Sequence, residues 1–234
     1  AGLNLAASTM GGTFSGTATT GDISDSGNLA ITAAATFITA ANGSNIILDA
    51  SGNAFSNAVT MKAGTGGGGT FGNITFVEGA AVKLDSNADE DGDLYLNAGN
   101  DLSVGGNLSI TAGAGNITQG AAVTVAGTSS FETSTSDADI VLSSENAFAQ
   151  KVTLTTFGAG GDATLDNGTT ALIIAASDVR GDLTLESGHA SGITDAVGET
   201  VTVGGNLSAT TTASNGDIDM GTLAVTGTIA LTTH

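Results

Sequence analysis

The sequence predicts an all-β protein, a right-handed parallel β-helix in which the whole chain of 234 residues forms a single solenoid. Three observations predict this fold. The chain nearly repeats itself every 93 to 94 residues, short segments alternate apolar and polar residues, and proline is absent. A tandem repeat is typical of solenoids, in which each coil contacts only its neighbours. The absence of proline suits strands that are paired on both sides.

The repeat is carried by apolar residues at matching positions. One residue is lost within it, because 52–55 returns as 145–148 at a spacing of 93. We expect one domain, 1–234, with copies near 1–51, 52–144 and 145–234 of a superrepeat of about four to five coils. At a spacing of 94, the matched residues are Ile23, Leu29, Ile31, Phe37, Ile46 and Leu48 with Ile117, Val123, Val125, Phe131, Ile140 and Leu142.

Short strands separated by tight corners are the expected elements throughout. Alternation with a period of two indicates a strand with one buried face. Between the strands lie corners such as Gly105-Gly106-Asn107 and Gly204-Gly205-Asn206, where glycine supplies the conformations that tight turns need. With about 20 residues to a coil the chain makes about 11 to 12 coils, and parallel crossovers are right-handed. The clearest alternating segments are 102–104, 108–110, 123–125, 152–154, 183–185 and 201–203.

Asparagine and phenylalanine also follow the pattern. Asparagine tolerates corner geometry and bonds nearby backbone, so we expect structural corners at Asn28, Asn73, Asn107, Asn116 and Asn206. The phenylalanines that recur with the repeat are expected in the core: Phe37, Phe55, Phe131 and Phe148. The remaining ones fit the repeat less well and are expected to cap or line loops: Phe14, Phe71, Phe76 and Phe157.

Composition and charge exclude several classes of protein. The chain is 40% apolar, which is enough for a core, and it carries 23 acidic against 4 basic residues, a net charge of −19. Such a charge repels nucleic acids and anionic membranes. Without cysteine there are no disulfides and no thiolate metal sites. The sequence also offers no apolar stretch long enough for a membrane helix, and we read the chain, which starts at Ala1 without a visible signal peptide, as a segment of a longer protein.

The densest acidic run is the candidate metal site. Calcium takes six to eight oxygen ligands, and the candidate ligands are Asp85, Asp89, Asp91 and Asp93. The run lacks the spacing of an EF-hand loop and the nonapeptide of calcium-binding β-rolls. A solvated loop between coils is therefore the alternative, and no other cofactor is expected.

Catalytic residues do not emerge from the pattern. His189 has Glu186 and Asp195 near it in sequence, but nothing singles out a nucleophile among the many serines and threonines. Four basic residues are too few for the clustered carboxylates and cations of polysaccharide-cleaving β-helices. We therefore expect that the protein is not an enzyme.

The repeated motifs resemble those of one known family. The segments 104–113 and 179–185 share a Val-x-Gly-(Asn/Asp)-Leu-(Ser/Thr)-(Ile/Leu) core, and Val-Thr-Val-x-Gly occurs at 123–127 and 201–205. This grammar resembles the repeat region of filamentous-haemagglutinin-like exoproteins, the large adhesins of two-partner secretion. The resemblance implies a β-helical shaft on the outside of a bacterial cell. Arg180-Gly181-Asp182 lies in one of these corners, so the repeat already explains its glycine and aspartate.

The expected function is accordingly that of a structural or adhesive shaft segment of a bacterial extracellular surface protein or filament. Its partners would be a host or neighbouring-cell surface or glycan. The unpaired strand edges of the two end coils also offer a route to head-to-tail self-association. The alternative is a Ca²⁺-dependent glycan-binding or polysaccharide-active β-helix that uses the acidic run.

Overall fold

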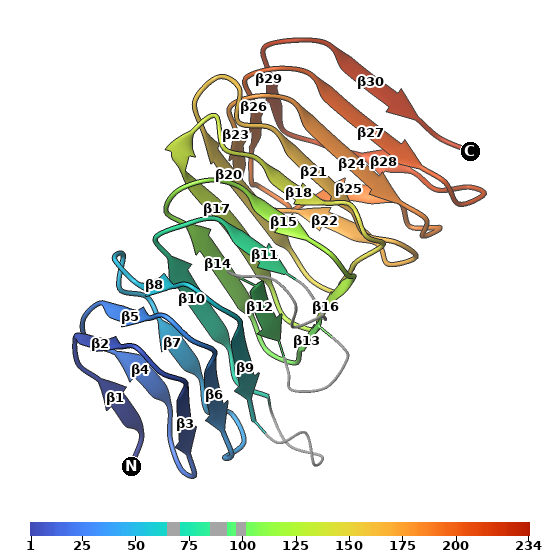
Figure 1. The fold of residues 1–234 in the computed structure, drawn as a ribbon. Helices are drawn as coiled ribbons and strands as arrows, with labels where there is room; N and C mark the ends of the chain where they lie inside the picture. The colour runs from blue at the N-terminus through green and yellow to red at the C-terminus, as the bar shows by residue number, and fades with distance from the viewer. Residues whose placement is uncertain (65–70, 85–92, 97–101) are drawn as a thin grey trace.

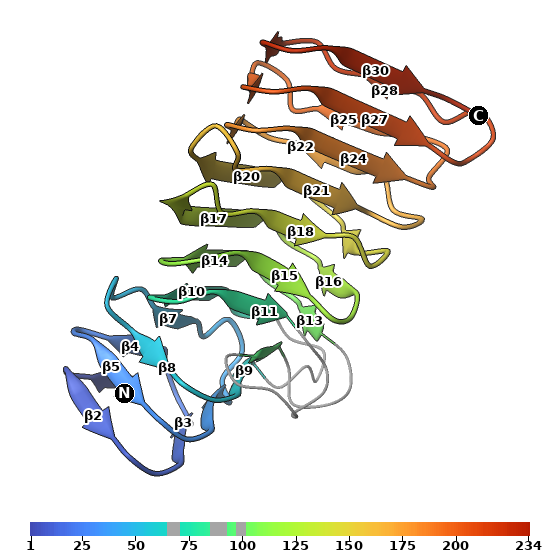
Figure 2. The ribbon, with the colours of Figure 1, turned by 45° about the horizontal axis from the view of Figure 1, so that its top comes forward.

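Parallel strands stacked coil on coil make up the protein, whose computed structural model describes residues 1–64, 71–84, 93–96 and 102–234 (Figure 1). The described residues form strands and contain no helix that could cross a membrane. The two termini lie at opposite ends of the stack (Figures 1 and 2). The predicted β-solenoid is therefore confirmed.

Two long sheets and two short ones run along the solenoid. The 13-stranded sheet contains β1 (Leu3–Leu5), β4 (Ile23–Asp25), β7 (Ile46–Leu48), β10 (Ile74–Glu78), β14 (Leu108–Ala112), β17 (Ser129–Ser136), β20 (Val152–Phe157), β22 (Leu172–Ile174), β23 (Ser177–Val179), β25 (Ile193–Asp195), β26 (Val201–Val203), β28 (Ile218–Asp219) and β29 (Leu223–Val225). The 11-stranded sheet contains β3 (Phe14–Ala18), β6 (Ala35–Thr39), β9 (Val59–Ala63), β11 (Val82–Leu84), β12 (Asp93–Leu96), β15 (Ile117–Gln119), β18 (Ile140–Leu142), β21 (Ala163–Asp166), β24 (Leu183–Ser187), β27 (Leu207–Thr211) and β30 (Ile229–Thr232). The short sheets are β2 (Ser8–Met10), β5 (Leu29–Ile31) and β8 (Ala54–Phe55), and β13 (Leu102–Val104), β16 (Val123–Val125) and β19 (Ala147–Phe148).

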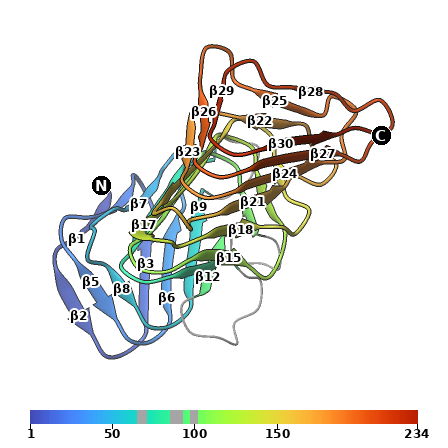
Figure 3. The same ribbon diagram turned by 90° about the horizontal axis from the view of Figure 1, so that it is seen from above.

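The number of coils corrects the sequence estimate. The structure has about 9 coils and not 11 to 12. In the 13-stranded sheet, Leu3 pairs with Ile23, Ile23 with Ile46, Ile46 with Ile74 and Ile74 with Leu108, so each of these coils is longer than the one before it. The estimate was too high because it assumed that every coil is as short as the first. Seen from above, successive strands of the 11-stranded sheet lie side by side (Figure 3).

The superrepeat is also shorter in space than expected. From β4, three steps of pairing lead through β7 and β10 to β14. The sequence counterpart of β4 is β15, the strand that follows β14 along the chain and belongs to the other long sheet. The repeated unit therefore spans three coils and one strand, where four to five coils were predicted, and matching residues lie in different sheets.

The core is a stack of aliphatic layers inside the coils. All of the apolar residues matched by the repeat, from Ile23 and Ile117 to Leu48 and Leu142, are fully buried in both copies. Strands such as β6, β10 and β14 alternate buried and half-buried residues along their length. Burial at period two thus carries the repeat into the core, as the alternation predicted.

Aromatic rings form two stacks within this core. Phe14, Phe37, Phe55 and Phe76 follow one another with ring centroids 5.2, 6.1 and 5.5 Å apart. Phe131 and Phe148 form the second stack at 5.6 Å. The four repeated phenylalanines are buried as predicted, whereas Phe76 was wrongly assigned to a loop because it lies outside the matched positions. Such pairs stabilise the stack by about 0.5 to 1.5 kcal/mol each beyond their burial.

Buried threonines close one corner of the coil in a recurring way. Thr39, Thr133, Thr156 and Thr211 each end the inward-facing row of a strand and donate a hydrogen bond from Oγ1 to the carbonyl oxygen five residues later. The donor–acceptor distances are 3.0, 3.1, 2.6 and 2.9 Å. All four side chains are buried. The hydroxyl satisfies a carbonyl that the corner would otherwise leave without a partner inside the protein.

Ser129 provides a test of core packing. It lies between Leu108 and Val152 in the ladder, and its buried Oγ makes no hydrogen bond. Its repeat counterpart is Ala35. Since an unsatisfied buried hydroxyl is costly, we expect Ser129→Ala to raise the free energy of unfolding by about 1 kcal/mol, measured by urea denaturation.

Ser177 is the matched control, because its buried Oγ accepts from the Leu154 N–H at 3.0 Å and donates to the Ala175 carbonyl. Ser177→Ala is expected to lower the free energy of unfolding by about 1 to 2 kcal/mol. Equal changes in the two variants would show that the missing partner of Ser129 does not matter.

Candidate functional site

The predicted calcium residues fall at the edge of what the structure describes. Asp85, Asp89 and Asp91 lie outside the described residues, and Asp93 begins β12 without a described side chain. In the part of the chain that is described, no three His, Cys, Asp or Glu side chains are arranged to hold a metal ion. Calcium binding by the acidic run remains a prediction.

Outer corners of the coils carry a ladder of asparagine and aspartate. Near the N-terminus, the side-chain oxygens of Asp22, Asn45 and Asn73 accept the backbone N–H of the corresponding residue one coil later, at 2.7 to 2.8 Å. Asn107 continues the series by accepting the N–H of Thr128. Each rung thus ties one coil to the next, and the predicted corner role of Asn73 and Asn107 is confirmed.

A second outer ladder runs toward the C-terminus. Asn116, Asp139, Asp162, Asp182 and Asn206 follow the same rule, each Oδ1 accepting a backbone N–H one coil on at 2.7 to 3.0 Å. A side chain that accepts this bond need not be neutral, so both carboxylates and amides occur in the ladder. The ladder uses one oxygen of each carboxylate for structure, which accounts for part of the acidic surface.

An inner ladder satisfies backbone donors inside the coils. Buried Asn53 and Asn146 accept the N–H groups of Leu29 and Val123 at 2.8 Å. Asn167 accepts the N–H of Phe148 at 2.8 Å. Asn53 and Asn146 are repeat counterparts, and so are the strands that they serve. These asparagines are structural, because their polar atoms are used by the backbone.

Glu78 replaces an asparagine in this inner ladder. Its Oε2 accepts the Phe55 N–H at 3.1 Å, the same bond that Asn167 makes to Phe148 in the other copy. The side chain is only 3% exposed. Burial raises the pKa of Glu78 to about 7, although hydrogen bonds from the backbone of Phe55, Ala80 and Gly79 oppose the rise. It is a buried carboxyl that changes charge near neutral pH.

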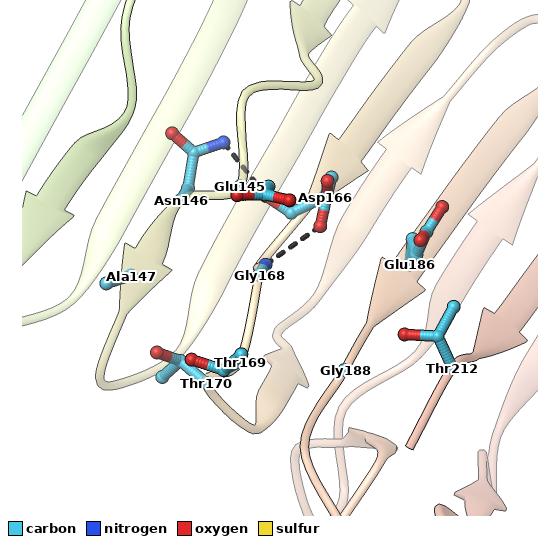
Figure 4. A pocket seen from close by; sticks show the side chains of 10 residues that line it. All are labelled: Glu145, Asn146, Ala147, Asp166, Gly168, Thr169, Thr170, Glu186, Gly188 and Thr212. Carbon is cyan, nitrogen blue, oxygen red and sulfur yellow. Dashed lines mark hydrogen bonds between the residues drawn. The ribbon is translucent and has the colours of Figure 1, made fainter.

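One shallow pocket of about 220 Å³ opens on the surface of the later coils (Figure 4). Carboxylates from three coils, Glu145, Asp166 and Glu186, line it together with hydroxyls of Thr169, Thr170 and Thr212. Asp166 accepts the N–H of Gly168 at 2.8 Å, and Glu186 lies directly opposite Asp166 in the ladder. Like charges in this position repel each other. The pocket is anionic and lacks a basic residue, so it is unsuited to acidic polysaccharides.

A second hollow lies beside the exposed Val197 and contains Asp195. Asp195 accepts the N–H groups of Gly221 and Thr222, both at 2.9 Å. The hydrogen bond from Gly221 is the main reason why the pKa of Asp195 is lowered. This carboxylate stays ionised and joins two coils, which is a structural role.

The Arg180-Gly181-Asp182 corner is fully used by the fold. The Arg180 guanidinium pairs with Asp178 at 2.8 Å, and Asp182 belongs to the second outer ladder. A Cβ on Gly181 would collide with the Asp162 side chain. The corner explains all three residues, as the repeat predicted.

His189 and its sequence neighbours do not form a catalytic set. The His189 Nδ1 accepts the N–H of Ser191 at 2.9 Å within its own turn. Glu186 lines the shallow pocket, and Asp195 bridges two other backbone groups. The pocket residues themselves were missed by the sequence pattern, although Glu145, Asp166 and Glu186 recur at almost even spacing, one coil apart.

Comparisons with known proteins identify a repeat family and nothing finer. The model of DUF5649, described as repeats of unknown function, matches residues 1–62 and 72–155, which is more than half of the chain. No curated protein and no solved structure matches the chain. None of these findings names the filamentous-haemagglutinin-like family that the motifs resemble.

Proposed function

Because the chain belongs to the DUF5649 family of repeats and folds as a β-solenoid, we propose that it is a shaft segment of a bacterial extracellular surface protein or filament. As a repeat-containing solenoid it is a structural repeat protein. The finer proposal concerns where the shaft stands and what it does. Its role there is to hold an attachment surface away from the cell.

The observation that carries the proposal is the continuity of the bonding from coil to coil. Parallel pairing runs through each long sheet, and the two outer ladders add side-chain bonds at the corners. The salt bridge of Lys151 to Glu199, at 2.7 Å, reaches across two coils, and the other Glu199 oxygen accepts the Ala176 N–H between them. A load on the rod is thereby shared by many bonds at each coil, as a mechanical element requires.

Support for an extracellular place comes from composition and from the resemblance of the motifs. A net charge of −19 opposes aggregation of the chain. The resemblance to secreted adhesins adds the partner class, a host or neighbouring-cell surface or glycan. The described site offers shallow anionic hollows and no nucleophile with an adjacent base, which favours a shaft over an enzyme.

Surface exposure on intact cells tests the proposal. Antibodies raised against the 234-residue chain are expected to label unpermeabilised cells of the source organism, and external protease is expected to remove that signal. An internal protein, labelled under the same conditions, is the control. Labelling that appears only after permeabilisation would overturn the extracellular role.

The three carboxylates in the shallow pocket, together with the acidic run Asp85–Asp93, favour a second candidate, Ca²⁺-dependent glycan binding. This function requires heat on calorimetric titration with Ca²⁺ and glycan-array signals that vanish with chelator. Asp89→Asn with Asp91→Asn would abolish the heat if the run binds the ion, and Glu145→Gln with Glu186→Gln would do so if the pocket binds it. The shaft alone predicts no heat in any of these chains.

A further inference from the structure

The C-terminal coil leaves its inward-facing side chains uncovered. Ile229 and Leu231 of β30 are each 51% exposed, whereas Leu207 and Ala209, their partners on β27, are 1% and 0% exposed. At the other end the inward-facing residues of β1 to β3 that include Leu3, Met10 and Phe14 are only partly buried against the core. Each end therefore presents apolar side chains and an unpaired strand edge.

The two ends share one pattern at a constant spacing. Adding 215 to a residue number of the first coil gives its counterpart in the last coil, without a gap over three strands. Gly12-Thr13 thereby matches Gly227-Thr228 at the corner before the third strand. The inward-facing pairs are Leu3 with Ile218, Leu5 with Met220, Met10 with Val225 and Phe14 with Ile229.

Strand lengths and side-chain sizes at the ends also correspond. The short strands β1 and β2 match β28 and β29, and the longer β3 matches β30. At the one inward position where the types differ most, glycine stands opposite leucine, since Gly16 corresponds to Leu231. A Cβ on Gly16 would press on the rings and methyls of Phe14 and Leu3, so the small residue leaves room above it for the Leu231 side chain.

We propose that the C-terminal coil of one copy binds the N-terminal coil of a second copy, with β28 on β1, β29 on β2 and β30 on β3 in parallel register. The inference rests on the proposed shaft function and specifies its partner. The contact continues both long sheets across the junction and covers Ile229 and Leu231. Since the two surfaces differ, the contact does not close on itself and builds a filament.

Charge sets the conditions under which the copies join. Each copy carries −19, so association is opposed at low ionic strength. Salt at about 0.15 M reduces the screening length to about 8 Å, which weakens repulsion between whole rods more than contact at their ends. Filaments are expected to lengthen as salt is raised.

Cysteine pairs test the register directly, because the chain contains no cysteine of its own. Asn4 and Asp219 face outward at matching positions, and so do Ser15 and Ala230. Stacked parallel strands place such Cα atoms about 4.8 Å apart, within the range of a disulfide. Asn4→Cys chains mixed with Asp219→Cys chains, and Ser15→Cys chains with Ala230→Cys chains, are expected to cross-link on mild oxidation.

The mismatched mixtures, Asn4→Cys with Ala230→Cys and Ser15→Cys with Asp219→Cys, are expected to give at least tenfold less product. Similar yields in matched and mismatched mixtures, products from one variant alone, or no product at any salt concentration would each overturn the register. The last result would mean that other coils cover these ends.

Sedimentation gives a second readout without cysteines. Leu231→Lys places a charge in the contact and is expected to leave the chain monomeric at salt where the wild type associates. Val197→Lys makes the same charge change at a fully exposed site and is expected to associate like the wild type. Association of Leu231→Lys at the wild-type salt concentration would refute the proposal. A monomeric wild type would refute it too, while surface labelling of intact cells would still decide the shaft function separately.

Discussion

Replacing Asn146 with alanine is expected to lower the free energy of unfolding by about 4 kcal/mol. Asn146 is 1% exposed, and its Oδ1 accepts the Val123 N–H and the Gln119 Nε2 group, both at 2.8 Å. Its Nδ2 donates to the carbonyl oxygens of Leu142 and Asp166, both at 2.9 Å. Alanine would leave these groups buried without partners, in three neighbouring coils at once.

Urea denaturation of Asn146→Ala measures this loss. The matched control is Asn107→Ala on the outer ladder, where one bond to the Thr128 N–H is lost at an exposed corner and water replaces it. We expect that control to cost under about 1 kcal/mol. Equal losses in the two variants would contradict a special role for the inner ladder.

Replacing Glu78 with glutamine is expected to change how stability depends on pH. The pKa of Glu78 is raised from 4.5 to about 7 by burial, so the folded protein holds the proton more tightly than the unfolded chain. Its contribution is therefore fully present below about pH 4.5 and is lost as the pH rises through about 7. The shift corresponds to about 3 kcal/mol.

Glutamine keeps the acceptor for the Phe55 N–H and stays neutral at every pH. The difference in unfolding free energy between Glu78→Gln and the wild type is expected to be near zero at about pH 4 and to reach about 3 kcal/mol in favour of the variant at about pH 8. The other carboxylates titrate alike in both chains and cancel in this difference. A difference that stays constant from acid to alkaline pH would show that Glu78 does not titrate in this range.

Much of the fold was predictable because burial follows local alternation. Residues such as Ile23, Phe37 and Leu142 lie in the core as the repeat and the period of two indicated. The number of coils was not predictable in this way. Coil length is set by the corners, and the two coils that precede Leu108 are longer than the first two without any change in the strand pattern.

The site was less accessible to sequence reasoning. The asparagine corners were predicted from local turn chemistry, but Glu78 was not related to Asn167, because the spacing between these two equivalents is shorter than the period of the repeat. Corner threonines such as Thr39 and Thr211 form their bonds within one turn, yet threonine is too common in this chain for four of them to stand out. Spacing by the length of one coil, such as the step from Leu3 to Ile23, is the signal that finds stacked polar residues.

The superrepeat that spans three coils and one strand has a consequence for how such rods evolve. With three strands to a coil, each duplicated unit begins one side of the rod further round than the unit before it. An array lengthened by copying this unit would show the same outward residues on all three sides in turn, and would return to the first side after three copies. A single ancestral surface motif would thus wind around the rod, available to a neighbour approaching from any direction.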